Sequence, residues 1–199
     1  MNISELLEAM RNCEQTKGMS IIEHGNMVSD YSNDLLEHLY YERSLKYEWK
    51  LPVWLLPNID FISDNIYVNK DLCTYQVFHD CGKPFCKVVD QEGGVHFPNH
   101  AKISGEIFRK VFSNKEHIAR LIEMDMDIHL LKSEDVLEFS NRPEAISLLI
   151  TALVEIHANA SLFGGIDSVS FKIKWKHINK RGKHILDQIN IKTNETHGN

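Results

Sequence analysis

Apolar residues recur every three or four positions along most of the chain, a pattern typical of amphipathic α-helices. The predicted helices cover residues 3–10, 20 into the forties, 70–81, 99–112, 115–131 and 143–163. The last of these is almost continuously apolar from Ile146 to Ile156, which predicts a buried helix. Residues 50–69, with Pro52 and Pro57, predict an extended crossover, and residues 84–98 a glycine-rich loop.

The last 34 residues follow a different pattern. Apolar and polar residues alternate over 168–176, which favours a strand, and the turn-prone segment Asn179–Gly182 precedes a possible second strand near 185–191. We therefore expect a mainly α fold with a short β-hairpin-like C-terminal extension. The expected domains are a helical domain over 1–165 and a basic extension over 166–199, with a disordered end.

Composition narrows the class of protein. A chain of 199 residues with 43% hydrophobic residues suits one globular domain, and a net charge of −6 argues against a protein that coats nucleic acid with basic surface. The charge is uneven, at −10 over residues 1–165 and +4 over the remainder.

Export and membrane insertion are not expected. No apolar run is long enough to span a bilayer, and the N-terminal segment lacks the order of a secretory signal. The four cysteines form no C-x-x-C pair and no zinc-ribbon spacing. These features favour a cytoplasmic protein with reduced thiols and no membrane partner.

Histidine is the unusual residue, with eleven in the chain. The pair His79-Asp80 ends an apolar helix, so an imidazole nitrogen and a carboxylate oxygen can face one cation. Gly82 would let the chain turn away from such a site. A further histidine is needed to complete it, and His24, His96 and His100 are all candidates.

These residues also occur in a recognisable order. His24 lies four positions before Val28 near a helix start, a later helix closes in FHDCGKP over residues 78–84, and His100 precedes Ser104-Gly105. This order resembles the HD superfamily of metal-dependent phosphohydrolases, most closely the HD domain of bacterial CCA-adding tRNA nucleotidyltransferases. The resemblance covers residues 20–165, without the nucleotidyltransferase portion, and implies an HD-domain-like helical bundle.

The resemblance implies four metal ligands: His24, His79, Asp80 and Asn159. The family has an aspartate at the last position, and the asparagine here coordinates without a negative charge, which should weaken metal binding. Extra histidines of two-metal members would match His100 and His129. The implied cofactor is a divalent ion: manganese, magnesium, nickel, cobalt or iron.

Phosphate-ester hydrolysis needs an activated water and positive charge near the phosphoryl oxygens, and a divalent ion supplies both. Asp80 would hold the ion, and Lys83 is placed to contact the phosphate as a point charge. His100 could bind phosphate, donate a proton to the leaving group or hold a second metal, and His96 is a further candidate for substrate binding.

The leading hypothesis is a phosphohydrolase that acts on a nucleotide or an RNA-end phosphate, as a 2′,3′-cyclic phosphodiesterase, a 2′-nucleotidase or a 5′-nucleotidase. The alternative is a decayed HD module that binds nucleotide or RNA without turnover, and Asn159 motivates it. A purely structural helical protein would not explain the histidines at helix ends.

The C-terminal tail offers a separate candidate surface. If the tail is a strand, Lys172, Lys174 and Lys176 share one face suited to phosphates.

Overall fold

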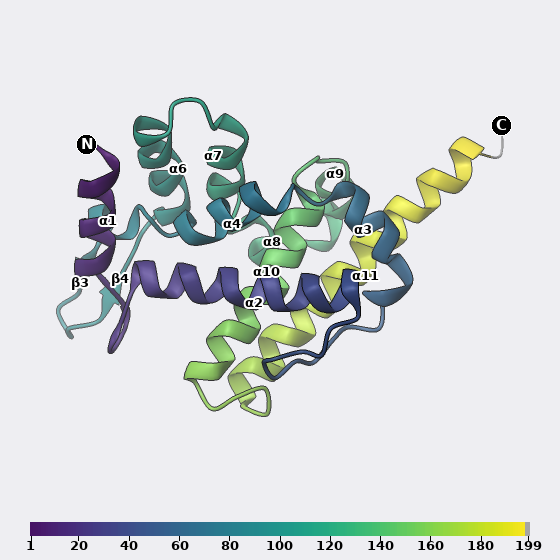
Figure 1. Ribbon diagram of the computed structural model, residues 1–199, viewed down its shortest axis with the longest axis horizontal. Coiled ribbons are helices and arrows are strands. Elements are labelled where there is room, and N and C mark those ends of the chain that lie inside the picture. Colours follow the sequence, from purple (N-terminus) through teal and green to yellow (C-terminus); the bar gives the residue numbers. More distant parts are fainter. Residues whose placement is uncertain (198–199) are drawn as a thin grey trace. The chain divides into compact units, whose positions relative to one another are not determined.

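A computed structural model describes the backbone of residues 1–197 and the side chains of residues 1–191. Its secondary structure is mainly helical, which confirms the predicted fold class (Figure 1). Within the described residues, β-structure is confined to two short antiparallel pairs. The last two residues of the predicted disordered end, 198 and 199, lie outside the described part.

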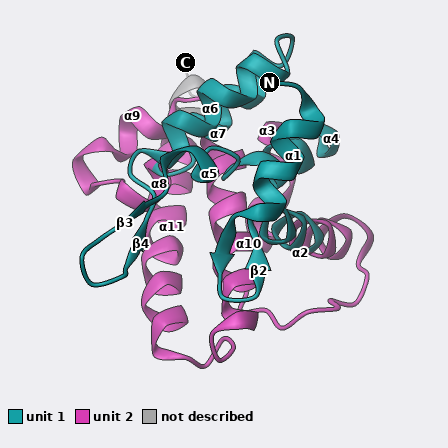
Figure 2. Cartoon of the chain, turned by 90° about the vertical axis from the view of Figure 1, so that its left-hand side faces the viewer, with its two compact units in different colours: residues 1–30, 68–126 teal, residues 31–67, 127–199 magenta. Residues whose placement is uncertain are grey.

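The chain divides into two compact units, each built from two segments (Figure 2). The first unit comprises residues 1–30 and 68–126, and the second comprises residues 31–67 and 127–199. Helix α2 (Ile21–Tyr41) passes from the first unit into the second. The domain boundary predicted after residue 165 stays a prediction.

The first unit is a helical cluster with two short hairpins. Besides the start of α2, its elements are α1 (Ile3–Asn12), β1 (Glu14–Thr16), β2 (Met19–Ser20), α4 (Asn69–Phe78), α5 (Lys83–Cys86), β3 (Val88–Val89), β4 (Val95–His96), α6 (His100–Val111) and α7 (Glu116–Glu123). Helix α7 packs against α6 and α4, while α5 packs against α6 and α1. The glycine-rich loop predicted over 84–98 is thus mostly a short helix and the β3–β4 hairpin.

The second unit is built around α10. Besides the end of α2, its elements are η1 (Leu56–Asn58), α3 (Ile59–Asn65), α8 (Asp127–Leu130), η2 (Ser133–Asp135), α9 (Val136–Ser140), α10 (Ala145–Leu162) and α11 (Val169–His197). Pro57 occupies an initial position of η1, where its missing N–H costs nothing, so the predicted extended crossover contains helix instead. The helix predicted over 115–131 is divided into α7 and α8.

Helix α10 is the core helix of the second unit, as its apolar run predicted. Leu149, Ile150, Leu153 and Val154 are completely buried. Among the described helices, α10 has the length and hydropathy of a membrane span, but 78% of that stretch is buried inside the protein. Such burial is typical of a core helix.

The C-terminal hairpin prediction is wrong, because residues 169–197 form one helix. Phe171, Ile178 and Ile185 are buried at seven-residue intervals, which is a helical repeat. The alternating pattern instead leaves Val169 and Ile173 exposed. The helical spacing over four turns therefore prevails over nine residues of alternation.

Candidate functional site

His24 is placed by the start of α2. The Ser20 hydroxyl and the Glu23 carboxylate bond each other's backbone N–H groups, with Ser20 N–H to Glu23 Oε2 at 2.8 Å and Glu23 N–H to Ser20 Oγ at 3.3 Å. This reciprocal pair fixes the first turn of the helix. His24 follows it directly, with its side chain fully buried.

His79 and Asp80 are placed by the end of α4, where His79 is the C-cap residue. The Nδ1 atom of His79 lies 2.7 Å from the backbone carbonyl of Gln76. Because a carbonyl only accepts hydrogen bonds, Nδ1 carries a proton, and Nε2 is the nitrogen that faces Asp80. A carbonyl behind the ring is the usual support of a metal-binding histidine.

The structure brings these three predicted ligands together. One donor atom each from His24, His79 and Asp80 lies within 4.8 Å of the other two. The Oδ2 atom of Asp80 is 3.2 Å from His79 Nε2 and 4.0 Å from His24 Nε2. All three side chains are buried, and all three belong to the first unit.

The cluster has the electrostatics of a cation site. Two imidazoles and an ammonium surround one carboxylate there, and the Nε2 atom of His79 faces Asp80 Oδ2 at 3.2 Å. Burial alone would raise the pKa of Asp80, but nearby His79, Lys83 and His24 outweigh it and hold that pKa far below its usual range. Asp80 is therefore a buried carboxylate that stays ionised, and its Oδ1 atom accepts no hydrogen bond from the described residues.

Lys83 is part of the same cluster. Its buried ammonium lies 2.6 Å from Asp80 Oδ2 and 3.0 Å from Gln15 Oε1, and 5.4 Å from the centre of the Phe97 ring. Sequence reasoning placed Lys83 near a substrate phosphate but missed Gln15. Gln15 lies on β1, and nothing in its local sequence marks it as a partner of Lys83.

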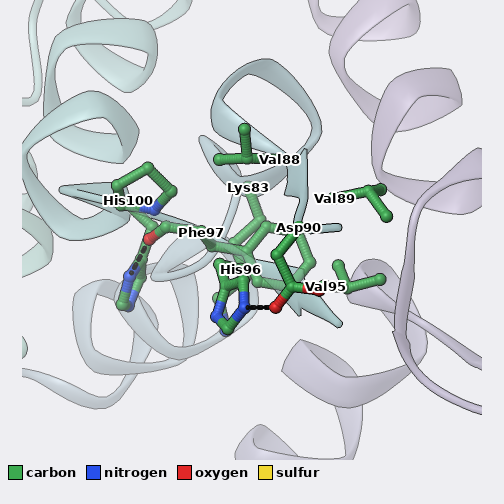
Figure 3. A pocket seen from close by; sticks show the side chains of 9 residues that line it. Lys83, Val88, Val89, Asp90, Val95, His96, Phe97 and His100 are labelled. Carbon is green, nitrogen blue, oxygen red and sulfur yellow. Dashed lines mark hydrogen bonds and ion pairs between the residues drawn. The ribbon is translucent and has the colours of Figure 1, made fainter. Parts of the chain in front are cut away.

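His100 joins the cluster to a neighbouring cavity. Its Nδ1–H donates to the Phe97 carbonyl at 3.1 Å, so Nε2 is directed elsewhere and lies 3.7 Å from Asp80 Oδ1. A cavity of about 540 Å³ is lined by Lys83, Val88, Val89, Asp90, Val95, His96, Phe97, Pro98 and His100 (Figure 3). Apart from its charged residues, the lining is apolar and aromatic.

His96 lies on the hairpin wall of this cavity. Its Nε2–H donates to Asp90 Oδ2 at 2.6 Å, a bond drawn in Figure 3, and its side chain is 62% exposed. The bond to His96 also lowers the pKa of Asp90. His96 thus ties β4 to the end of β3, while its predicted contact with substrate stays a prediction.

Gly82 lies in a turn, as predicted, and it has a packing role that was not predicted. Gly82 has an ordinary right-handed backbone, so it does not supply an unusual turn. A methyl group there would lie 2.4 Å from the backbone nitrogen of Ser104, and the Gly82 N–H donates to Ser104 Oγ at 2.8 Å. The glycine is required for close approach to α6, and Ser104 is a second residue that local reasoning did not assign.

The neighbouring thiol is not a candidate nucleophile. Cys81 is fully buried, and burial raises the pKa of its thiol strongly. Its Sγ lies 3.4 Å from the Ser104 carbonyl. The cysteine therefore packs beside the cluster as a neutral side chain.

Asn159 and His129 lie in the second unit. Asn159 is on α10, and its amide nitrogen is 3.4 Å from Glu155 Oε1. His129 is on α8, with Nε2 3.6 Å from Glu155 Oε2. The proposed roles of both residues as metal ligands stay predictions.

His157, which follows Glu155 on the same helix, is a structural histidine. Its Nδ1–H donates to the Leu153 carbonyl at 2.7 Å, and its Nε2 accepts the Lys50 N–H at 3.1 Å. Both ring nitrogens are thus used by the neutral imidazole. Burial lowers the pKa of His157 to about 4.

We expect this histidine to make the protein less stable in acid. The unfolded chain takes up the His157 proton below pH 6.5 and the folded chain only near 4, so stability falls as the pH drops through that interval. The loss approaches about 3 kcal/mol at its lower end. Denaturant unfolding between pH 7.5 and 4.5 should show a shallower pH dependence for His157→Gln than for the parent chain, and equal slopes would contradict this assignment.

No family model, curated protein or solved structure matches the chain, so these comparisons assign it to no family. Membership of the HD superfamily accordingly stays a prediction.

Proposed function

We propose that the chain is a divalent-metal phosphohydrolase that acts on a nucleotide or an RNA-end phosphate. The observation that carries the proposal is the buried set of His24, His79 and Asp80, whose donor atoms lie within 4.8 Å of one another. Two imidazoles and one carboxylate are a common donor set for divalent transition metals. Of the expected ions, manganese, iron, cobalt and nickel suit these donors better than magnesium does.

The residues around the cluster fit this chemistry. A divalent ion held there would supply positive charge to the phosphoryl oxygens and activate water at neutral pH. Lys83 and His100 contact Asp80 and also line the cavity, so a phosphate held between them faces the cluster. Lys83 would neutralise charge on the phosphate, and the free Nε2 side of His100 is placed to bind it.

The apolar lining of the cavity supports a substrate with a flat, uncharged part. Phe97 and the three valines of the hairpin offer surface for a nucleobase, while Lys83 and His100 face the phosphate end. The cavity volume of about 540 Å³ is within the ordinary range for small-ligand sites. These contacts favour a nucleotide over an inorganic phosphate as substrate.

A second candidate function is nucleotide binding without turnover. It is favoured by the ion pair between Lys83 Nζ and Asp80 Oδ2 at 2.6 Å, because the lysine already compensates the buried carboxylate. A site neutralised in this way needs no metal to be stable. The two candidates differ in whether the purified protein holds a metal and hydrolyses a phosphate ester.

Metal analysis and a substrate panel test the proposal directly. The purified full chain would be titrated with Mn²⁺, Mg²⁺, Ni²⁺, Co²⁺ and Fe²⁺ and then assayed on 2′,3′-cyclic nucleotides and on 2′-, 3′- and 5′-mononucleotides. We expect tight binding of at least one ion and hydrolysis of at least one substrate. Neither metal nor hydrolysis would overturn the proposal, and nucleotide binding without hydrolysis would establish the second candidate.

A further inference from the structure

The helical form of the C-terminal segment gathers lysine, arginine and histidine side chains that a strand would have separated. Lys174, His177, Arg181 and His184 follow one another at steps of three or four residues on α11, so they share one face of the helix. Helix α11 packs against α8 and α9 within the second unit. The side chains of this face line hollows together with the residues that follow α8.

Two hollows adjoin each other along this face. One, of about 170 Å³, is lined by Leu131, Lys132, Ser133, Val136, His177, Lys180, Arg181 and His184. The other, of about 320 Å³, is lined by His129, Lys174, His177, Ile178 and Arg181. They share His177 and Arg181, and neither lining includes an acidic residue.

Four of the five lysines of α11 with described side chains fall into two groups, and the fifth, Lys176, neither lines a hollow nor forms an ion pair with a described residue. Lys172 pairs with Asp167 at 3.1 Å and Lys183 pairs with Asp187 at 2.6 Å, and neither lines a hollow. Lys174 and Lys180 do line the hollows, and neither forms an ion pair with any described residue. The two α11 lysines that face the hollows are therefore both without a carboxylate partner among the described residues.

Arg181 lies between the two hollows and is held in position. Its Nε–H donates to the Leu131 carbonyl at 3.2 Å, which leaves the other guanidinium nitrogens for a ligand. His129, which lines the larger hollow, has Glu155 Oε2 at 3.6 Å from its Nε2. A ligand that satisfies this lining must carry negative charge at more than one point.

We propose that this groove, defined by the residues that line the two hollows, binds a small anion with two or more linked phosphate groups, such as the polyphosphate of a nucleotide. Arginine and lysine recognise phosphate oxygens by charge-assisted hydrogen bonds. Lys174, Lys180 and Arg181 line two hollows that share residues, an arrangement that suits a compact anion better than a long one. The lining also has no phenylalanine, tyrosine or tryptophan, whose large rings are the usual platforms for RNA bases.

The test is a binding titration of the full chain with inorganic tripolyphosphate in the presence of EDTA. Chelation removes any metal from the His24–His79–Asp80 cluster, so the result is independent of the proposed hydrolysis. We expect tripolyphosphate to bind and orthophosphate to bind at least about tenfold more weakly. A parallel titration with a nucleoside triphosphate shows whether the base and ribose increase the affinity above that of tripolyphosphate.

A matched pair of double variants locates the site. Lys174→Gln with Lys180→Gln is expected to weaken tripolyphosphate binding by at least about tenfold. Lys172→Gln with Lys183→Gln changes the net charge equally, and we expect it to change the affinity by less than about threefold, since exposed charges outside the groove are screened. All four lysines are exposed, so both variants should fold.

Three results would overturn the proposal. The parent chain could fail to bind tripolyphosphate, the two double variants could lose affinity equally, or a short single-stranded RNA with a 5′-hydroxyl end could bind while tripolyphosphate does not. The last result would assign the groove to nucleic acid backbone. None of these results depends on whether the chain hydrolyses a phosphate ester.

Discussion

Asp80→Asn is expected to abolish phosphate-ester hydrolysis and to weaken divalent-metal binding by about 100-fold or more. Asparagine keeps the shape of the side chain but removes the charge that lies 3.2 Å from His79 and 4.0 Å from His24. Two neutral imidazoles remain as donors, and an amide oxygen is a weaker ligand than a carboxylate. The far-UV circular dichroism of the variant should stay helical.

The same substitution has a second consequence for stability. Lys83 Nζ lies 2.6 Å from Asp80 Oδ2 and is nearly buried, so Asp80→Asn leaves an ammonium group without its counter-charge. Breaking a buried pair from one side costs about 3 kcal/mol of unfolding free energy. Adding Lys83→Met removes the stranded charge, and we expect it to restore most of the lost stability without restoring metal binding.

Asp71→Asn is the control for this experiment. Asp71 also belongs to α4 and also has basic partners, with His117 at 2.9 Å and Lys115 at 3.8 Å, but its side chain is 24% exposed. We expect the control to keep full metal binding and to lose at most about 1 kcal/mol of stability. Unchanged metal affinity and turnover in Asp80→Asn would show that the metal site lies elsewhere.

The helices were predictable because most of them bury one continuous stripe. On α10, Ile146, Leu149, Leu153 and Val154 repeat at helical spacing, and all four are buried. The tail was mispredicted because its first nine residues fit both periods. Only the buried residues farther along, such as Ile178 and Ile185, distinguish a helix from a strand there.

The centre of the candidate site was also visible in the sequence. His79 and Asp80 are adjacent in the chain, and His24 was chosen as their partner from the order of motifs that resembles the HD superfamily. The spacing alone left His24, His96 and His100 equally possible. The structure places His24 and His100 against Asp80, whereas His96 is bonded to Asp90 on the hairpin.

The partners that complete the cluster could not be predicted. Gln15 reaches Lys83 from 68 positions away, and Ser104 reaches Gly82 from 22. Such contacts depend on how α1, α5 and α6 pack, and neither glutamine nor serine carries a local signal for a distant bond. The packing role of Gly82 was missed for the same reason, since a close approach of two backbones has no local signature.

Gly25→Ala is expected to destabilise the first unit and to weaken metal binding together. Gly25 follows His24 on α2, and a methyl group there would lie 2.3 Å from the backbone oxygen and 2.9 Å from the backbone carbon of Val77. Val77 is two residues before His79 on α4, so the clash falls directly beside the cluster. Because the obstructing atoms are backbone, rotation of a side chain cannot relieve it.

The only relief is separation of α2 from α4, which would move His24 away from His79 and Asp80. We expect Gly25→Ala to lower the free energy of unfolding by about 3 kcal/mol. This loss outweighs the gain of about 1 kcal/mol that alanine ordinarily gives a helix over glycine. Gly25→Val should lose more, because its larger side chain requires a wider separation. Denaturant unfolding and a metal titration of each variant measure the two effects.

Asn26→Ala provides the matched control at the next position of α2, where the side chain is exposed. It raises helix propensity without a clash, so its stability should equal or exceed that of the parent chain. If Gly25→Ala were as stable as Asn26→Ala, the close approach of the two helices would be wrong. If it were unstable but bound metal with full affinity, His24 would not be a ligand, because a ligand carried on α2 must move with that helix.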